Sequence, residues 1–142
     1  MNADGTGRRN LTANTRLTDS FAPDWSPDGR HIAFNSRLNF RGNEIFVITV
    51  DGKELEQLTE GGANIGPVYS PDGTKIAFVS LRGGNYNIYM MDTNGRNVVK
   101  LTKTPPGTDN VNLSWPRGAL AVNPNGKLPI SWGELKRTGK PL

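Results

Sequence analysis

The chain has 142 residues, of which 35% are hydrophobic and 21% are charged, and it contains 17 glycines and 10 prolines. This length suits one compact domain, and the composition excludes a membrane span, a coiled coil, a collagen-like rod and wholesale disorder. The net charge of +4 lies mostly in residues 127–142, and the sequence has no cysteine, so neither a nucleic-acid surface nor thiol chemistry is expected. A turn-rich, all-β chain remains.

Residues 4–12 are predicted to form a turn and one outermost β-strand. The Leu11-Thr12 pair at the end of this stretch recurs as Leu58-Thr59 and Leu101-Thr102, which close the later units. No earlier strands accompany it in the chain. We therefore expect 4–12 to complete a blade whose other strands lie elsewhere.

Residues 13–59 read as the first complete unit of four short strands. The first strand is expected at 23–26 and is followed by a Pro-Asp-Gly turn, in which glycine supplies the positive φ of a tight hairpin. The second strand, 32–36, is short and apolar, as in a buried sheet. The third, 44–50, turns through Asp51-Gly52 into a more polar fourth strand, 54–59.

Residues 60–102 repeat this unit. Trp25-Ser26-Pro27-Asp28-Gly29 recurs 44 positions later as Tyr69-Ser70-Pro71-Asp72-Gly73, and four strands are expected at 67–70, 76–80, 87–92 and 97–102. A degraded third copy, 103–132, starts its motif at Trp115 and lacks an outermost strand. Residues 133–142 form a basic tail.

Four-stranded units of 43 to 45 residues with two tight turns each favour the blades of a β-propeller over a β-sandwich, which would not repeat its side chains at this period. The motif Trp25 to Ser36, followed by Ile45-Phe46-Val47, Asp51-Gly52 and Leu58-Thr59, resembles the TolB-like (WD-like) β-propeller repeat. This resemblance implies a propeller, often six-bladed, that works outside the cytoplasm as a binding scaffold or as the non-catalytic part of a larger enzyme.

The strand count amounts to about three blades, and propellers normally need four to eight to close. Two interpretations follow. Either the remaining blades belong to a longer chain, or two copies associate head to tail as a homo-oligomer, each chain being half of a six-bladed ring. By the resemblance the compartment is periplasmic or extracellular, although the first residues show neither a basic leader nor an apolar core, so no signal peptide is expected in this chain.

Residues that recur at equivalent positions are interpreted as structural. Three aromatic residues at one repeat position are expected to pack blade against blade, and the aspartates and glycines of the hairpins are expected to hold the turns. These residues are Trp25, Asp28, Gly29, Tyr69, Asp72, Gly73 and Trp115.

Catalysis and metal binding are not expected. His31 is the only histidine, its counterpart in the next repeat is Lys75, and no Gly-x-Ser-x-Gly motif is present. Each Pro-Asp-Gly turn holds a single acid, which is too few for a calcium loop. No enzyme activity, no cofactor and no metal are predicted.

The loops between the second and third strands differ between the repeats, so architecture does not dictate their sequence. Together with the loops that join the blades, they are expected to form one rim around the channel mouth, where arginines beside aromatic residues suit recognition of a protein or an anionic ligand. The candidate binding residues are Arg37, Phe40, Arg41, Arg82, Asn85 and Tyr86, with Lys103 nearby.

Three classes of function are therefore carried forward. The leading class is a non-enzymatic scaffold that binds a protein or ligand at the loop rim. The alternatives are an accessory propeller domain of a larger hydrolase or lyase and a self-assembling structural blade module with no ligand. Neither a nucleic acid nor a membrane is expected as a partner.

Overall fold

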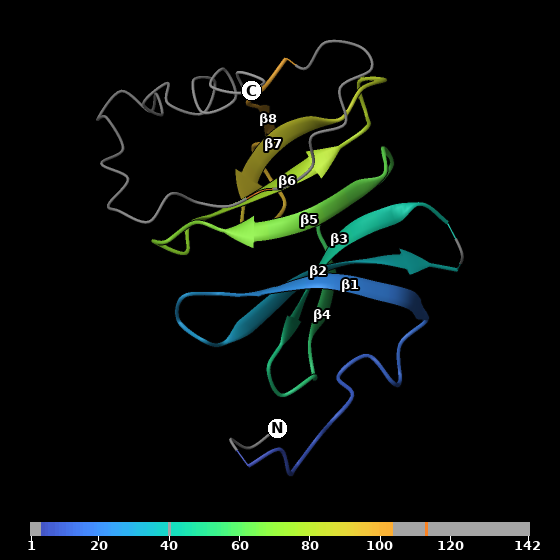
Figure 1. Ribbon diagram of the computed structural model, residues 1–142, viewed down its shortest axis with the longest axis vertical. Coiled ribbons are helices and arrows are strands. Elements are labelled where there is room, and N and C mark those ends of the chain that lie inside the picture. Colours follow the sequence, from blue (N-terminus) through green and yellow to red (C-terminus); the bar gives the residue numbers. More distant parts are fainter. Residues whose placement is uncertain (1–3, 40, 104–112, 114–142) are drawn as a thin grey trace, which may run out of the picture.

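The computed structural model describes residues 4–39, 41–103 and 113, which form two four-stranded antiparallel sheets stacked on each other (Figure 1). Each sheet is a simple meander in which consecutive strands pair. Within this described part of the chain, no helix is long and apolar enough to cross a membrane. The strands are β1 (Leu17–Trp25), β2 (His31–Leu38), β3 (Asn43–Thr49), β4 (Leu55–Gln57), β5 (Asn64–Tyr69), β6 (Lys75–Ser80), β7 (Asn87–Asp92) and β8 (Val99–Lys100).

The two sheets are the predicted blades, and the prediction of all-β, four-stranded antiparallel units is confirmed. Strand β7 has its predicted bounds, whereas β4 and β8 are shorter than expected, with three and two residues. Both short strands are exposed and pair on one side only, which suits the polar outermost strand of a blade. The number of blades in the complete ring stays a prediction.

Strand β1 begins six residues before its predicted start because it continues through two irregularities in its pairing with β2. One of them has an equivalent in β5, where the register shifts between Ile65 and Val68. At this bulge Gly66 has a φ of +59°, and Ala22, 44 positions earlier, has a φ of +50°. The bulge is thus a repeated feature, but only the second blade has the residue that tolerates this backbone without strain.

Residues 4–12 form turns, bends and irregular segments in the described chain, and their pairing with strands that lie elsewhere stays a prediction. A β-strand needs a neighbour to receive its hydrogen bonds, and no described strand pairs with this segment. Leu11 nevertheless packs against the Phe34–Phe46–Ile48 cluster of the first blade. A Cβ atom built on Gly52 would lie 3.3 Å from Leu11 Cδ2.

This contact repeats between the two blades. A Cβ atom built on Gly95, in the β7–β8 turn, would lie only 2.8 Å from the carbonyl oxygen of Leu58, which ends the first unit. Leu11 and Leu58 are the leucines of the repeated Leu-Thr pair, and Gly52 and Gly95 are the glycines of the repeated turn. Residue 11 therefore has the predicted place between repeats, although it is not in a strand.

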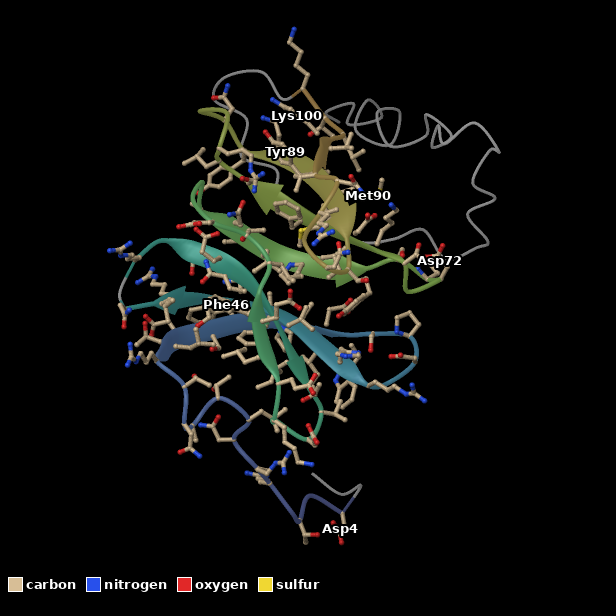
Figure 2. All side chains as sticks on the ribbon, turned by 180° about the vertical axis from the view of Figure 1, so that it is seen from behind. Asp4, Phe46, Asp72, Tyr89, Met90 and Lys100 are labelled. Carbon is tan, nitrogen blue, oxygen red and sulfur yellow. The ribbon has the colours of Figure 1, made fainter. Side chains whose placement is uncertain are left out.

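The main core lies between the sheets. Ala33, Ile45 and Val47 on one face of the first blade form one buried cluster with Tyr69 and Phe78 of the second. The side chains on the other face of the first blade include Phe46, whose counterpart in the second blade is Tyr89 (Figure 2). Each blade repeats a stacked ring pair, Phe34–Phe46 and Phe78–Tyr89, with centroids 5.9 Å apart in both.

The three aromatic residues predicted as wedges between blades have different outcomes. Tyr69 is 7% exposed and lies in the core between the sheets, as expected. Trp25 is 58% exposed, and because no described blade precedes β1, its packing between blades stays a prediction. Its side of β1 has no described blade against it. Phe40 and Trp115 lie outside the described residues. So do the basic tail and the rest of the third unit from residue 104 onward, apart from residue 113.

Candidate functional site

The two Ser-Pro-Asp-Gly turns have the same internal geometry. Ser26 Oγ donates a hydrogen bond to Asp28 Oδ1 at 2.6 Å and accepts one from the His31 amide at 2.9 Å. Ser70 repeats both contacts with Asp72 and the Lys75 amide. The hydroxyls of both serines thus form the hydrogen bonds that close the hairpin, which supports a structural role for them.

Both turn aspartates are stabilised in the charged form. The hydrogen bond from the serine hydroxyl, followed by a backbone amide two residues on, lowers the pKa of Asp28 and of Asp72 below the ordinary value. Gly29 and Gly73 have φ angles of +69° and +71° in these turns. The conformation demands glycine, as the sequence predicted.

At the other end of the strands, the loop rim contains a hollow of about 410 Å³. It lies where the β2–β3 loop of the first blade meets residues 58–63, the joining segment between β4 and β5. Of the predicted binding residues that are described, only Arg41 lines it. The other lining residues are Leu38, Gly42, Glu44, Gln57, Glu60, Gly61, Gly62 and Ala63.

The remaining rim arginines are already engaged. Arg37 forms an exposed ion pair with Asp19 at 3.6 Å. Arg82 donates to Asn64 Oδ1 at 3.1 Å, and its guanidinium lies 5.0 Å from the ring centroid of Tyr89. The structure therefore assigns Arg82 to the packing of the second blade, whereas Arg41 remains an exposed cation at the hollow.

The other candidates lie at the second hairpin of the rim. Asn85 and Tyr86 are half-buried, and the Asn85 carbonyl accepts a hydrogen bond from Asn87 Nδ2 at 2.9 Å. Lys103 is exposed. The joining segment links the two hairpins, because Leu81 donates its amide to the carbonyl of Gly62 at 2.7 Å.

The buried carboxylate of Glu44 holds the joining segment between the two blades in place. Glu44, 7% exposed, accepts hydrogen bonds from Thr59 Oγ1 at 2.6 Å, from the Gly61 amide at 2.7 Å and from Asn64 Nδ2 at 2.7 Å. Arg82 binds the other end of the Asn64 amide, so a series of three side chains, Glu44, Asn64 and Arg82, connects the first blade to the second. A charge buried in this way is stable only with its donors in place.

Sequence reasoning missed Glu44 and Glu60 because it selected cations and aromatic residues on the rim. The signal was available at position 44, where the second repeat has Asn87 instead of an acid. The rule that repeat-variable positions are functional candidates selects Glu44 as readily as Arg41. This rule does not reveal that Glu44 is buried, because its burial depends on the position of the joining segment, whose Thr59 and Gly61 bind its carboxylate.

Repeated four-stranded meanders, stacked face to face with a common turn and a common ring pair, define a β-propeller repeat protein. Residues 3–127 match the TolB beta propeller domain, and the chain belongs to this family. The resemblance found in the sequence is thereby confirmed.

Individual relatives agree with this assignment. The chain is 38% identical over 86 residues to the protein TolB homolog of Chlorobium luteolum, a match that covers 59% of this chain and 19% of that protein. The solved structure of a putative TolB from Agrobacterium tumefaciens is 33% identical with a TM-score of 0.59, covering 63% of this chain and 32% of that one. TolB from Acinetobacter baumannii is 31% identical with a TM-score of 0.57, covering 70% and 25%. The matches thus span between a fifth and a third of these relatives.

Proposed function

We propose that this chain contributes blades to a non-enzymatic propeller scaffold that is completed by further blades and binds a protein or ligand at its loop rim. The observation that supports the proposal best is the first face of the first blade. Trp25 on β1 is 58% exposed on this face, whereas Tyr69, its counterpart on the equivalent strand β5, is buried by the preceding blade. Exposed aromatic surface of this kind is typical of an interface.

The completing blades come from a second copy of the chain in this proposal, which makes the assembly a homo-oligomer. In a head-to-tail ring the last blade of one copy packs against the first blade of the next, so two different surfaces meet, as they do between the two blades of one chain. Family membership supports a scaffold in the periplasm or outside the cell.

The assembly is tested by native mass spectrometry and sedimentation of the full chain, whose mass is 15.5 kDa. We expect a multiple of this mass at micromolar concentration, and Trp25→Glu should shift the chain to a monomer that keeps its circular dichroism spectrum. Leu55→Glu is the matched control, because Leu55 is also exposed but lies on the outermost strand β4. A sharp monomer for the wild type would overturn assembly from copies of this chain.

Binding at the rim is tested separately. Native mass spectrometry of the purified chain also reports any ligand it retains, and Arg41→Ala should abolish retention because Arg41 is the exposed arginine of the hollow. Arg16→Ala removes an exposed arginine that lies outside the hollow and serves as the control. Equal retention by both variants would remove the rim from consideration.

A further inference from the structure

The pair Leu58-Thr59, which ends the first unit, contacts both blades. The Leu58 amide donates to the carbonyl of Ile45 at 2.8 Å, and Thr59 Oγ1 accepts a hydrogen bond from the Ile45 amide at 2.9 Å. Both backbone groups of one third-strand residue are therefore bound just beyond the end of the short strand β4. On its other side, Leu58 belongs to the buried cluster that contains Phe78 of the second blade.

The second blade repeats these two hydrogen bonds. The Leu101 amide donates to the carbonyl of Ile88 at 2.8 Å, and Thr102 Oγ1 accepts a hydrogen bond from the Ile88 amide at 2.9 Å. Ile88 has the same place on β7 as Ile45 has on β3. In each blade, a leucine amide and a threonine hydroxyl thus hold one residue of the third strand, and we call this arrangement the Leu-Thr clamp.

Leu11 and Thr12 carry the same two groups without a third strand. Among the described residues, no hydrogen bond uses the Leu11 amide and none is donated to Thr12 Oγ1. The Thr12 hydroxyl donates to Asn10 Oδ1 at 3.0 Å and keeps its lone pairs for a donor. This pair is therefore a clamp whose third strand is not in the described part of the chain.

Leu11 already has the position that Leu58 takes against the following blade. Leu11 packs against the Phe34–Phe46–Ile48 cluster of the first blade, and Leu58 belongs to the equivalent cluster of the second. One half of the contact between blades is thus in place at Leu11. The half that is lacking is the pairing with a third strand.

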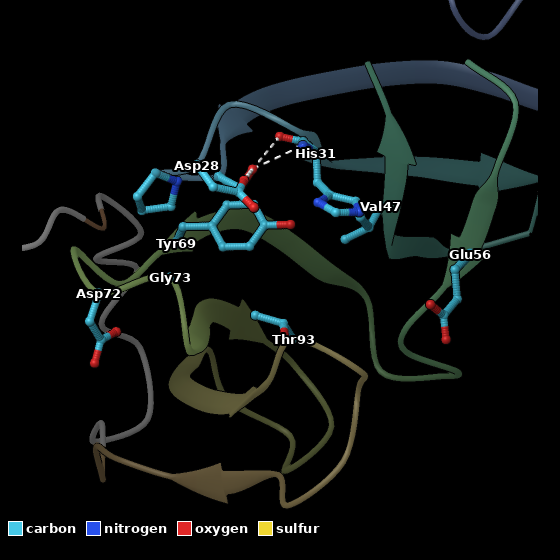
Figure 3. Close-up of a pocket in the computed structure, with 10 residues that line it drawn as sticks. Asp28, His31, Val47, Glu56, Tyr69, Asp72, Gly73 and Thr93 are labelled. Carbon is cyan, nitrogen blue, oxygen red and sulfur yellow. Dashed lines mark hydrogen bonds between the residues drawn. The ribbon is translucent and has the colours of Figure 1, made fainter. Parts of the chain in front are cut away.

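The backbone before β1 also lies where an outermost strand lies between the described blades. There, Thr93 of the β7–β8 turn and Glu56 of β4 line one cleft of about 300 Å³ between the two Ser-Pro-Asp-Gly turns (Figure 3). The turn of one blade therefore faces the outermost strand of the preceding blade. In the first blade the equivalent turn faces residues 9–11, where Arg9 Nη2 donates to the carbonyl of Val50 at 3.1 Å.

The spacing of the repeat assigns this clamp to a preceding blade. Leu11 lies 14 residues before Trp25. Leu101 lies at the same distance before Trp115, and a Thr-Asp dipeptide follows seven residues after the leucine in both segments. Because Leu101 ends the unit before the third one, Leu11 by the same spacing ends a unit before the first.

A second copy of the chain is the source of the third strand that fits these observations. The described third strands β3 and β7 already pair with β4 and β8. The third unit, in contrast, is predicted from the sequence to lack an outermost strand. The segment before β1 and the strand β8 lie at opposite ends of the described structure (Figure 1). Since about three units are too few to close a ring, the clamp and the third unit meet only between copies.

We propose that Leu11 and Thr12 bind the third unit of a second copy of this chain and complete its blade. The Leu11 amide donates to a carbonyl of the partner's third strand, and Thr12 Oγ1 accepts a hydrogen bond from the amide of the same residue. This inference rests on the homo-oligomer proposed above and adds the contact that joins its copies. The donated segment pairs with the partner by main-chain hydrogen bonds, as in other cases of strand addition to a sheet edge.

Hydrogen exchange of the full chain tests the pairing, when it is measured above and below the concentration at which the copies dissociate. We expect the Leu11 amide to be protected only in the assembled chain, because its acceptor belongs to the partner. The amides of Leu58 and Leu101 have their acceptors in the same chain and should be protected at both concentrations. A Leu11 amide that exchanges rapidly in the assembled chain would overturn the inference.

Sedimentation of three variants locates the contact at the clamp. Thr12→Val keeps the shape of the side chain but removes the accepting hydroxyl, so it should weaken association about tenfold. Asn10→Ala removes only the local hydrogen bonds to Thr12 and should change association by less than about twofold. Thr102→Val makes the same change in a clamp within one chain, so it should lower the melting temperature and leave association unchanged.

The outcomes separate this inference from the oligomer on which it rests. An assembled wild type with equal association of Thr12→Val would contradict the clamp and leave the oligomer standing. A wild type that is monomeric at all concentrations would contradict both.

Discussion

Strands β1 and β5 have the same place in their blades and opposite surroundings. Strand β5 lies against β1, β2 and β3 of the preceding blade, and Asn64, Pro67 and Tyr69 on it are buried. Strand β1 has no described blade before it, and Phe21 and Trp25 on it are exposed. A repeat sequence therefore specifies the inside of a blade by itself, but the burial of its first strand depends on the preceding blade.

The contrast also extends to polar contacts between the blades. Asp24 accepts a hydrogen bond from the amide of Tyr69 at 2.7 Å, and Asn35 accepts one from the amide of Gly66 at 3.1 Å. Both acceptors differ from their counterparts in the second repeat, Val68 and Val79. The surface that the first blade offers to the second is thus specific to that pair of blades.

The largest effect is expected from truncation of the aromatic residue at the repeat position. Tyr69→Ala should lower the free energy of unfolding by about 4 kcal/mol, because it leaves a cavity between the blades. Trp25→Ala should change it by less than about 0.5 kcal/mol under conditions where the chain is monomeric. Urea denaturation of both variants measures the difference. Equal losses in the monomer would show that β1 is packed as tightly as β5, against the comparison.

The buried carboxylate should rank next. Glu44→Ala leaves the amide of Gly61 and the side chain of Asn64 without their acceptor, so the free energy of unfolding should fall by about 3 kcal/mol. Glu54→Ala removes an exposed acid and should change stability by less than about 0.5 kcal/mol. Thermal unfolding checks both. A mild effect at Glu44 would show that its hydrogen bonds contribute little to the attachment of the second blade to the first.

At the bulge that β1 and β5 share, two substitutions are expected to change stability in opposite directions. Ala22→Gly relieves a left-handed backbone and should stabilise the chain by about 0.5 kcal/mol, after the higher entropy of unfolded glycine is subtracted. Gly66→Ala introduces the same strain and should destabilise it by about 0.5 kcal/mol, since a Cβ there meets no atom within 4 Å. Chemical denaturation of the two variants gives the values. A change of the same sign in both would show that the bulges differ in kind.

The smallest difference is expected between the two turn aspartates, because both accept hydrogen bonds from the turn serine and from the amide two residues on, and Asp72 adds only one from Thr74 Oγ1. The folded state lowers the pKa of Asp28 and Asp72, so the unfolded state binds more protons near pH 4. Their contribution to stability is present above the unfolded pKa and is lost as pH falls through the folded pKa. Asp28→Asn and Asp72→Asn should each make the acid dependence of denaturation less steep, to a similar extent. A flatter profile in only one variant would separate the turns.

Much of the fold could be predicted from the sequence, because the residues that determine turns and strands lie close together in the chain. Glycine at positive φ, serine and aspartate that close the hairpin, and alternating apolar residues all act within one unit. The early start of β1 was not predicted, because its extra residues pass through a bulge that has no apolar alternation. The strand at 4–12 stays a prediction, because a strand forms only when another strand pairs with it and its expected partners are not among the described strands.

The candidate sites were less predictable than the fold. The sequence grouped Arg37, Arg41 and Arg82 by loop type, but Arg82 stacks on the ring of Tyr89 and binds Asn64, contacts that depend on neighbouring strands.

The contact of Leu58 with Gly95, repeated by Leu11 with Gly52, has a consequence for synthesis on the ribosome. The end of each unit lies against a turn that is translated about 40 residues later. Because domains fold from the N-terminus as the chain emerges, the earlier leucine is in place before the turn that closes over it exists. We therefore expect the blades to be added in one direction, with each new hairpin forming against the leucine of the preceding unit.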